Sequence, residues 1–196
     1  MKMIVIGASA GGFEPLVEIL GALPASLTAA VLVLRHLSRD APTILVELLA
    51  QRTALPVREA TDGLVISPGV IYVGPPGDWV EFREVEGDHG TAVVFTTRPS
   101  DDQLPSTIDV SLEAAAEVFG EDLIAVVLSG ALSDGTAGSR IVGHHGGTTI
   151  VQAPTEAKFD SMPRSVMRQE SHDFALPAQR IGPTLVALLE GRFPTG

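Results

Sequence analysis

Three uninterrupted apolar runs constrain the fold of this chain more than any other feature. They cover residues 4–6, 30–34 and 123–128, and each is followed by a polar or glycine-rich turn and then by a helical pattern. Continuous runs of this kind are typical of parallel strands that are covered on both faces. Strands that alternate with helices through short joins favour right-handed crossovers. We therefore predict an α/β fold with a doubly wound, mostly parallel sheet flanked by helices on both faces.

Two further segments predict an antiparallel hairpin inserted at one edge of that sheet. Residues 79–82 and 91–95 have strand-forming composition, and a charged, turn-rich stretch separates them. Later in the chain, Ser106 precedes a helical pattern over residues 108–119. Its acids Asp109 and Glu113 lie one turn apart, and we interpret them as a solvated helix face.

The first apolar run breaks into Gly7-Ala8-Ser9-Ala10-Gly11, and a helical pattern begins at Phe13. A strand, a small-residue turn and a helix form the context in which G-x-S-x-G presents a nucleophilic serine, here Ser9. Two alternatives stay open: a glycine-rich phosphate-binding loop and a plain tight turn. The phosphate alternative is weakened because a serine replaces the middle glycine. It is weakened again because Arg35-His36 follows the second run, where an acidic ribose ligand is expected.

The other two apolar runs are also followed by residues that acyl-transfer chemistry needs. His36 follows the second run and Asp134 lies in the loop after the third. A histidine there is often structural, and an aspartate in such a loop is often only a helix cap. Taken together with Ser9, they provide a nucleophile, a base and an acid that orients the base, a triad recognised by geometry rather than by chain order.

Composition bounds the remaining possibilities. The 196 residues suit one domain, 1–196, and the net charge of −11 without a basic cluster argues against nucleic acid as a partner. The absence of cysteine excludes a thiol nucleophile and fits a reducing compartment. No apolar run is long enough to insert into a membrane, so we expect a cytoplasmic protein. His144-His145 lack the spacing of a helical zinc pair, and we expect no metal and no cofactor.

Seven collinear stretches resemble the catalytic domain of the chemotaxis-receptor methylesterases, the CheB family. The resemblance implies a Ser–His–Asp triad on Ser9, His36 and Asp134, hydrolysis of glutamate methyl esters on the cytoplasmic helices of a methyl-accepting chemotaxis receptor, and deamidation of certain glutamines there. The stretches are Ile6–Gly12, Val33–His36, Val57–Gly63, Pro68–Gly74, Pro105–Asp109, Leu128–Gly135 and Phe159–Pro163.

The chain departs from the family pattern at two places. Family members usually carry Thr or Ser at the position of Ala10, and Gly-Met-Gly where this chain has Gly130-Ala131-Leu132. No receiver domain precedes the catalytic stretch, so the expectation is a standalone domain whose activity phosphodonors leave unchanged. Two other functions remain in view: a small-molecule carboxylesterase using the same site, and a non-catalytic binding or regulatory module.

Overall fold

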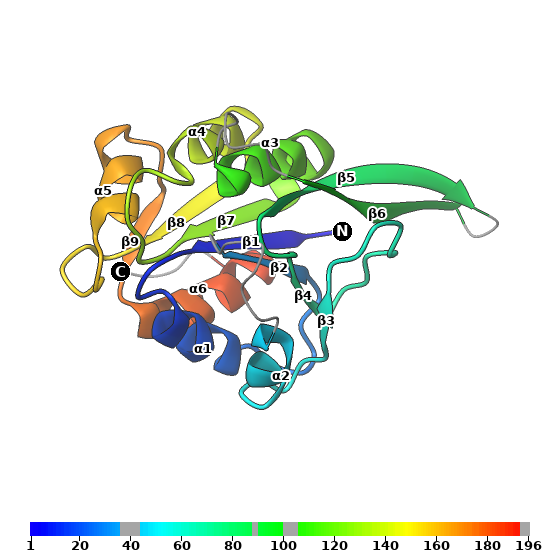
Figure 1. Ribbon diagram of the computed structural model, residues 1–196, viewed down its shortest axis with the longest axis horizontal. Coiled ribbons are helices and arrows are strands. Elements are labelled where there is room, and N and C mark those ends of the chain that lie inside the picture. Colours follow the sequence, from blue (N-terminus) through cyan, green and yellow to red (C-terminus); the bar gives the residue numbers. More distant parts are fainter. Residues whose placement is uncertain (36–43, 88–89, 100–105, 193–196) are drawn as a thin grey trace.

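A seven-stranded parallel sheet lies between two layers of helices (Figure 1). The computed structural model describes residues 1–35, 44–87, 90–99 and 106–192. The strand order is β3-β4-β2-β1-β7-β8-β9. The strands are β1 (Met3–Ala8), β2 (Ala30–Arg35), β3 (Val57–Glu59), β4 (Ile71–Val73), β7 (Leu123–Val127), β8 (Thr148–Gln152) and β9 (Phe174–Leu176).

The predicted parallel strands are confirmed, and their burial explains their continuous apolar sequences. All six residues of β1 are buried. Because successive side chains of a strand point to opposite faces, Met3 and Val5 enter one core while Ile4 and Ile6 enter the other. A run that alternated apolar and polar residues would place polar side chains in one of these two cores.

Helices cover both faces of the sheet, as expected (Figure 1). One layer consists of α1 (Phe13–Gly21), α2 (Leu45–Ala50) and α6 (Ala178–Leu189), and the other of α3 (Thr107–Phe119), α4 (Thr136–His144) and α5 (Ser161–Arg168). A short 3-10 helix, Gly120–Asp122, follows α3. The helix start expected at Ser106 is confirmed, because its hydroxyl accepts a hydrogen bond from the Ile108 amide at 3.2 Å.

The predicted hairpin forms a two-stranded antiparallel sheet of its own, β5 (Asp78–Gly87) and β6 (Gly90–Pro99). It packs against α3, where the Val80 amide donates to the Ser111 hydroxyl at 2.8 Å. Phe82 contacts Phe119 of α3 edge to face, with ring centroids 5.2 Å apart. The rest of the hairpin extends away from the body of the molecule (Figure 1).

The strand order reverses at β1. From this central strand the chain adds β2, β4 and β3 on one side and later adds β7, β8 and β9 on the other. In open α/β sheets ligands bind outside the carboxyl ends of the strands at such a reversal. The loops after β1 and β7 are therefore where the fold places a candidate site. None of the helices in the described ranges has the length and apolarity needed to cross a bilayer.

Candidate active site

Ser9 directly follows β1 and lies in a sharp turn that only small residues permit. Gly11 has a φ of 71°, and a Cβ atom there would lie 2.9 Å from the Ser129 hydroxyl. A Cβ on Gly12 would lie 2.8 Å from that of Ala8. The turn is fixed by two backbone hydrogen bonds, from the Ser9 amide to the Ser129 carbonyl and from the Gly12 amide to the Ser9 carbonyl, both 3.1 Å. The sequence GASAG thus forms a strand–turn–helix elbow.

The loop after β7 closes in on the Ser9 side chain. A Cβ on Gly130 would lie 2.9 Å from the Ser9 Cβ and 1.8 Å from the Met162 sulfur, so no side chain fits at this position. The Met162 amide donates to the Gly130 carbonyl at 3.1 Å, which brings the start of α5 to the same place. Among the described residues, the amides of Ala10 and Ala131 have no hydrogen-bond acceptor.

Asp134 lies in this loop, four residues beyond Gly130, and only 8% of its surface is exposed. The N-cap of α4 is Gly135, in the left-handed conformation at φ 85°, rather than Asp134. Leu132 also has a positive φ, 65°, and is 73% exposed. A leucine rarely adopts this conformation. The loop therefore keeps a backbone that suits glycine at the position where the family pattern has one.

His36 lies outside the described residues, so its place relative to Ser9 stays a prediction. The strand that leads to it is described: Arg35, the last residue of β2, is in register with Ala8, which immediately precedes Ser9. Arg35 is half-buried, and burial lowers the pKa of its guanidinium while the nearby Glu14 carboxylate partly opposes that shift. The second apolar run thus ends at the same sheet edge as the elbow.

The interpretation of Asp109 as part of a solvated helix face is wrong. Its carboxylate accepts a hydrogen bond from the Gly138 amide at 2.8 Å, which ties α3 to the first turn of α4. Burial is the main cause that raises the pKa of Asp109. Hydrogen bonds from Gly138, Gly135 and Ser106 lower this pKa, and the negative charge of Asp134 raises it further. Glu113 is exposed, as expected. The helical spacing did not reveal the contact because Gly138 is 29 residues away in sequence.

Ser129 is a site residue that the sequence reasoning missed. It is fully buried, and its hydroxyl accepts from the Phe159 amide at 2.9 Å. The same hydroxyl lies in donating geometry to the carbonyls of Ala10 at 2.9 Å and Phe159 at 3.2 Å. The Ser129 amide donates to the Gln152 side chain at 2.9 Å. One serine therefore connects the elbow, β8 and the segment before α5.

Ser129→Ala is expected to lower the free energy of unfolding by about 1–3 kcal/mol, because the Phe159 amide loses its acceptor and the Ser129 hydroxyl is fully buried. We also expect a lower kcat/KM for ester hydrolysis, since the elbow loses its link to the segment before α5. Chemical denaturation and steady-state kinetics measure the two effects. Ser26→Ala, at an exposed position, is the matched control and should change stability by less than about 0.5 kcal/mol. Wild-type values for Ser129→Ala in both measurements would contradict this role.

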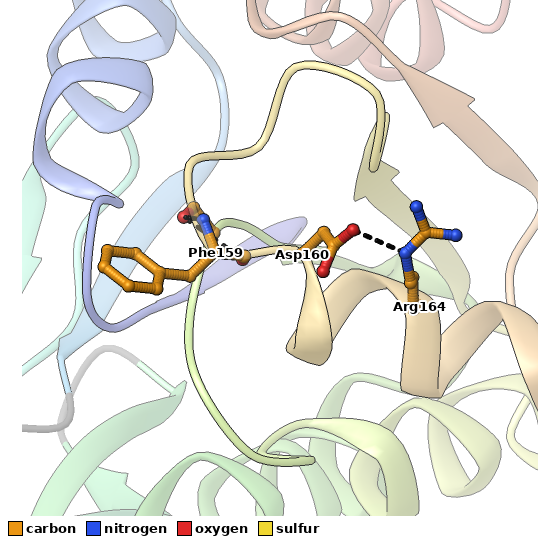
Figure 2. Close-up of polar contacts among 4 residues, drawn as sticks. Phe159, Asp160 and Arg164 are labelled. Carbon is orange, nitrogen blue, oxygen red and sulfur yellow. Dashed lines mark hydrogen bonds and ion pairs between the residues drawn. The ribbon is translucent and has the colours of Figure 1, made fainter.

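The segment before α5 lines the elbow with an exposed aromatic ring. A Cβ on Gly11 would lie 3.0 Å from the Phe159 ring, and Phe159 is 44% exposed. Figure 2 shows the Phe159 side chain pointing away from the neighbouring ion pair, in which Asp160 accepts from the Arg164 Nε at 2.5 Å. The apolar side of this segment thus faces the elbow, and its charged side faces away from it.

No group of three or more His, Asp or Glu side chains within the described ranges is arranged to hold a metal ion. His144 and His145 are both exposed at the end of α4. The chemistry that the described residues supply is a serine in an elbow, a buried carboxylate in the adjoining loop, and two free amides beside the serine. Such a set suits covalent catalysis on a carbonyl carbon.

Comparisons with known proteins agree on one family. The family model described as CheB methylesterase matches residues 4–185. A Thermotoga maritima protein named protein-glutamate methylesterase/protein-glutamine glutaminase is 32% identical over 96% of this chain and 54% of its own length. A Leptospira interrogans protein that bears the same name provisionally is 32% identical over 95% of this chain and 94% of its own.

The solved structures include the catalytic domain of the Thermotoga maritima CheB methylesterase. It superposes with a TM-score of 0.88 and 33% identity, covering 95% of this chain and 98% of that domain. The chain spans about half the length of several curated relatives that it matches, including those from Thermotoga maritima and Methanosarcina barkeri.

Proposed function

Because this chain belongs to the CheB methylesterase family, we propose that it hydrolyses the γ-methyl esters of glutamate side chains on a protein and releases methanol. The observation that carries the proposal is the family match over residues 4–185, which includes the strand–turn–helix elbow at Ser9. The names of the relatives add a second reaction at the same site, deamidation of protein glutamines.

In this proposal Ser9 is the nucleophile, His36 is its general base and Asp134 orients the histidine. A serine hydroxyl is a weak nucleophile until a base accepts its proton. A buried carboxylate that accepts from the other imidazole nitrogen fixes the tautomer and stabilises the imidazolium. The burial of Asp134 supports this role, and so does the register that ends β2 beside the elbow.

The reaction then proceeds in two halves. The Ser9 oxygen bonds to the ester carbon while its proton moves to His36, and the resulting tetrahedral intermediate expels methoxide, which takes that proton and leaves as methanol. Water then attacks the acyl-enzyme while its proton moves to His36, and that proton passes to the Ser9 oxygen as the acyl bond breaks. The glutamate side chain of the protein is released as a carboxylate. With a glutamine substrate the first leaving group is ammonia instead of methanol.

The free amides of Ala10 and Ala131 are suited to stabilise the oxyanion of both intermediates. The amide of the residue after the nucleophile commonly serves this purpose in G-x-S-x-G elbows, and here that residue is Ala10. A Cβ on Gly130 would lie 2.9 Å from the Ser9 Cβ, so the Ala131 amide follows directly after a residue that is close to Ser9. Backbone donors also explain how Ala10 can replace a hydroxyl residue, because the donating amide does not depend on the side chain.

We further propose that the protein substrate is a methyl-accepting chemotaxis receptor and that the reaction takes place in the cytoplasm. The family supports the receptor, because its relatives act on protein glutamates and glutamines. A protein substrate is also consistent with the exposed apolar side chains of Leu132 and Phe159 beside the elbow, which would remain in contact with water in the absence of a partner.

Methanol release from a methylated chemoreceptor tests the proposal directly. We expect hydrolysis at a rate well above that with N-acetylglutamate γ-methyl ester, because only the protein substrate reaches the residues around the elbow. Ammonia release from the amidated receptor measures the deamidase reaction. A small-molecule carboxylesterase would show the reverse preference between the two esters. A non-catalytic module would release no methanol and would not react with a fluorophosphonate.

A further inference from the structure

A polar pocket of about 430 Å³ lies between the loop that carries Asp134 and the helices α3, α4 and α5. Its wall contains two arginines, three hydroxyls, one amide and one carboxylate: Arg140, Arg168, Ser133, Thr136, Ser165, Gln169 and Asp109. In Figure 1 the helices α4 and α5 lie on the same face of the sheet. The pocket is therefore next to the candidate active site but is formed mainly by a different set of residues.

Helical spacing explains why these side chains converge. Ser133, Thr136 and Arg140 are separated by three and four residues, and they follow one side of α4 and the turn before it. At the end of α5, Arg168 and its C-cap Gln169 follow Ser165 by three and four residues, which is the spacing of neighbours on one helix face. Two stripes that face each other across a pocket place both guanidinium groups around the same space.

Neither Arg140 nor Arg168 is paired with a carboxylate in the described part of the chain. Arg164, one turn before Arg168 on the same helix, differs because it is paired with Asp160 and does not line the pocket. The Thr136 hydroxyl oxygen in the pocket wall is also buried without a hydrogen-bond partner. The pocket thus offers two free cations.

The single acid of the wall does not neutralise these cations. Asp109 already accepts from the Gly138 amide, and its other hydrogen bonds are to Gly135 and Ser106 rather than to an arginine. Guanidinium groups with nearby hydroxyls recognise carboxylates and phosphates, often with two parallel hydrogen bonds. The wall is therefore suited to an oxyanion.

We propose that this pocket binds an acidic side chain of the protein substrate, close to the glutamate ester that is hydrolysed. The inference rests on the proposed function for the identity of the substrate. Ser133 lines the pocket and immediately precedes Asp134, so the pocket adjoins the loop that carries the proposed triad aspartate. The chain carries a net charge of −11 and repels an acidic protein in general, which makes a local pair of free arginines the place where such a segment can dock.

The test compares two helical peptides on the wild-type chain and on Arg140→Gln/Arg168→Gln. Both peptides contain one central glutamate. In the acidic peptide the positions three, four and seven residues away from it are glutamates, and in the alanine peptide these positions are alanines. We expect wild type to bind the acidic peptide about tenfold or more tightly than the alanine peptide, because charge-assisted hydrogen bonds to guanidinium are strong. The double variant should lose that preference. Fluorescence anisotropy measures the affinities and requires no turnover.

Arg164→Gln/Arg180→Gln is the matched control, with the same change of net charge at positions outside the pocket. We expect this control to keep the preference for the acidic peptide. Equal affinity of wild type for both peptides would overturn the inference, and so would an equal loss in the control. Binding of inorganic phosphate without any preference between the peptides would also overturn it, in favour of a phosphate ligand.

The same peptides with a central methyl ester separate this inference from the proposed function. In Arg140→Gln/Arg168→Gln we expect KM for the acidic ester peptide to rise about tenfold. Its kcat and its hydrolysis of N-acetylglutamate γ-methyl ester should be unchanged. Absence of hydrolysis by wild type, with the binding preference intact, would contradict the proposed function and leave the subsite supported. Normal hydrolysis by wild type, without a binding preference for the acidic peptide, would support the proposed function and contradict the subsite.

Discussion

Ser9→Ala is expected to lower kcat for methyl-ester hydrolysis by about 10⁴- to 10⁶-fold, since the acyl-enzyme can no longer form. Ser9 follows β1 in the elbow, and the change from hydroxyl to methyl removes one atom at a partly exposed position. We therefore expect little change in the melting temperature. Methanol release from the methylated receptor and labelling by a fluorophosphonate measure the loss.

The double variant Ser9→Ala/His36→Ala should be about as inactive as either single variant, because a nucleophile and its base act as one unit. Ser26→Ala, an exposed serine after α1, is the control and should retain full activity. Wild-type rates in Ser9→Ala would show that the elbow is only a turn. Multiplicative losses in the double variant would show that Ser9 and His36 act independently.

Asp134→Asn carries the second largest expected effect, a loss of about 10⁴-fold in kcat, since an amide cannot hold the histidine in the required tautomer. The fold should tolerate the change. Asp134 is not the N-cap of α4, and its negative charge adds to the pKa rise of the nearby Asp109. Removing that charge is expected to lower the pKa of Asp109, which carboxyl chemical shifts followed by NMR can measure.

Asp62→Asn, at an exposed turn position, is the control for Asp134→Asn. It removes the same charge and should leave both activity and the Asp109 titration unchanged. If Asp134→Asn retained wild-type kcat while its Asp109 titration shifted, Asp134 would be a structural neighbour of Asp109 and not a member of a triad.

The elements of the sheet could be predicted because their signals are local. The runs 4–6 and 30–34 fall within β1 and β2, and the run 123–128 covers β7 and one residue beyond it. These strands are almost wholly buried, and a strand covered on both faces favours a continuous apolar sequence. The elbow was equally local: Gly11 needs a positive φ, and the small residues around it permit the sharp turn. The sequence signals for these features therefore lie within a few consecutive residues.

The sequence by itself determined the parallel sheet, the elbow at Ser9 and the family. Only the tertiary structure decided how the site is supported, because the contacts join residues far apart in the chain. Ser129 reaches Ala10 over 119 positions, Gly130 meets Met162, and Asp109 meets Gly138. Arg140 and Arg168 line the same pocket because α4 packs against α5. No periodicity within either helix specifies that packing.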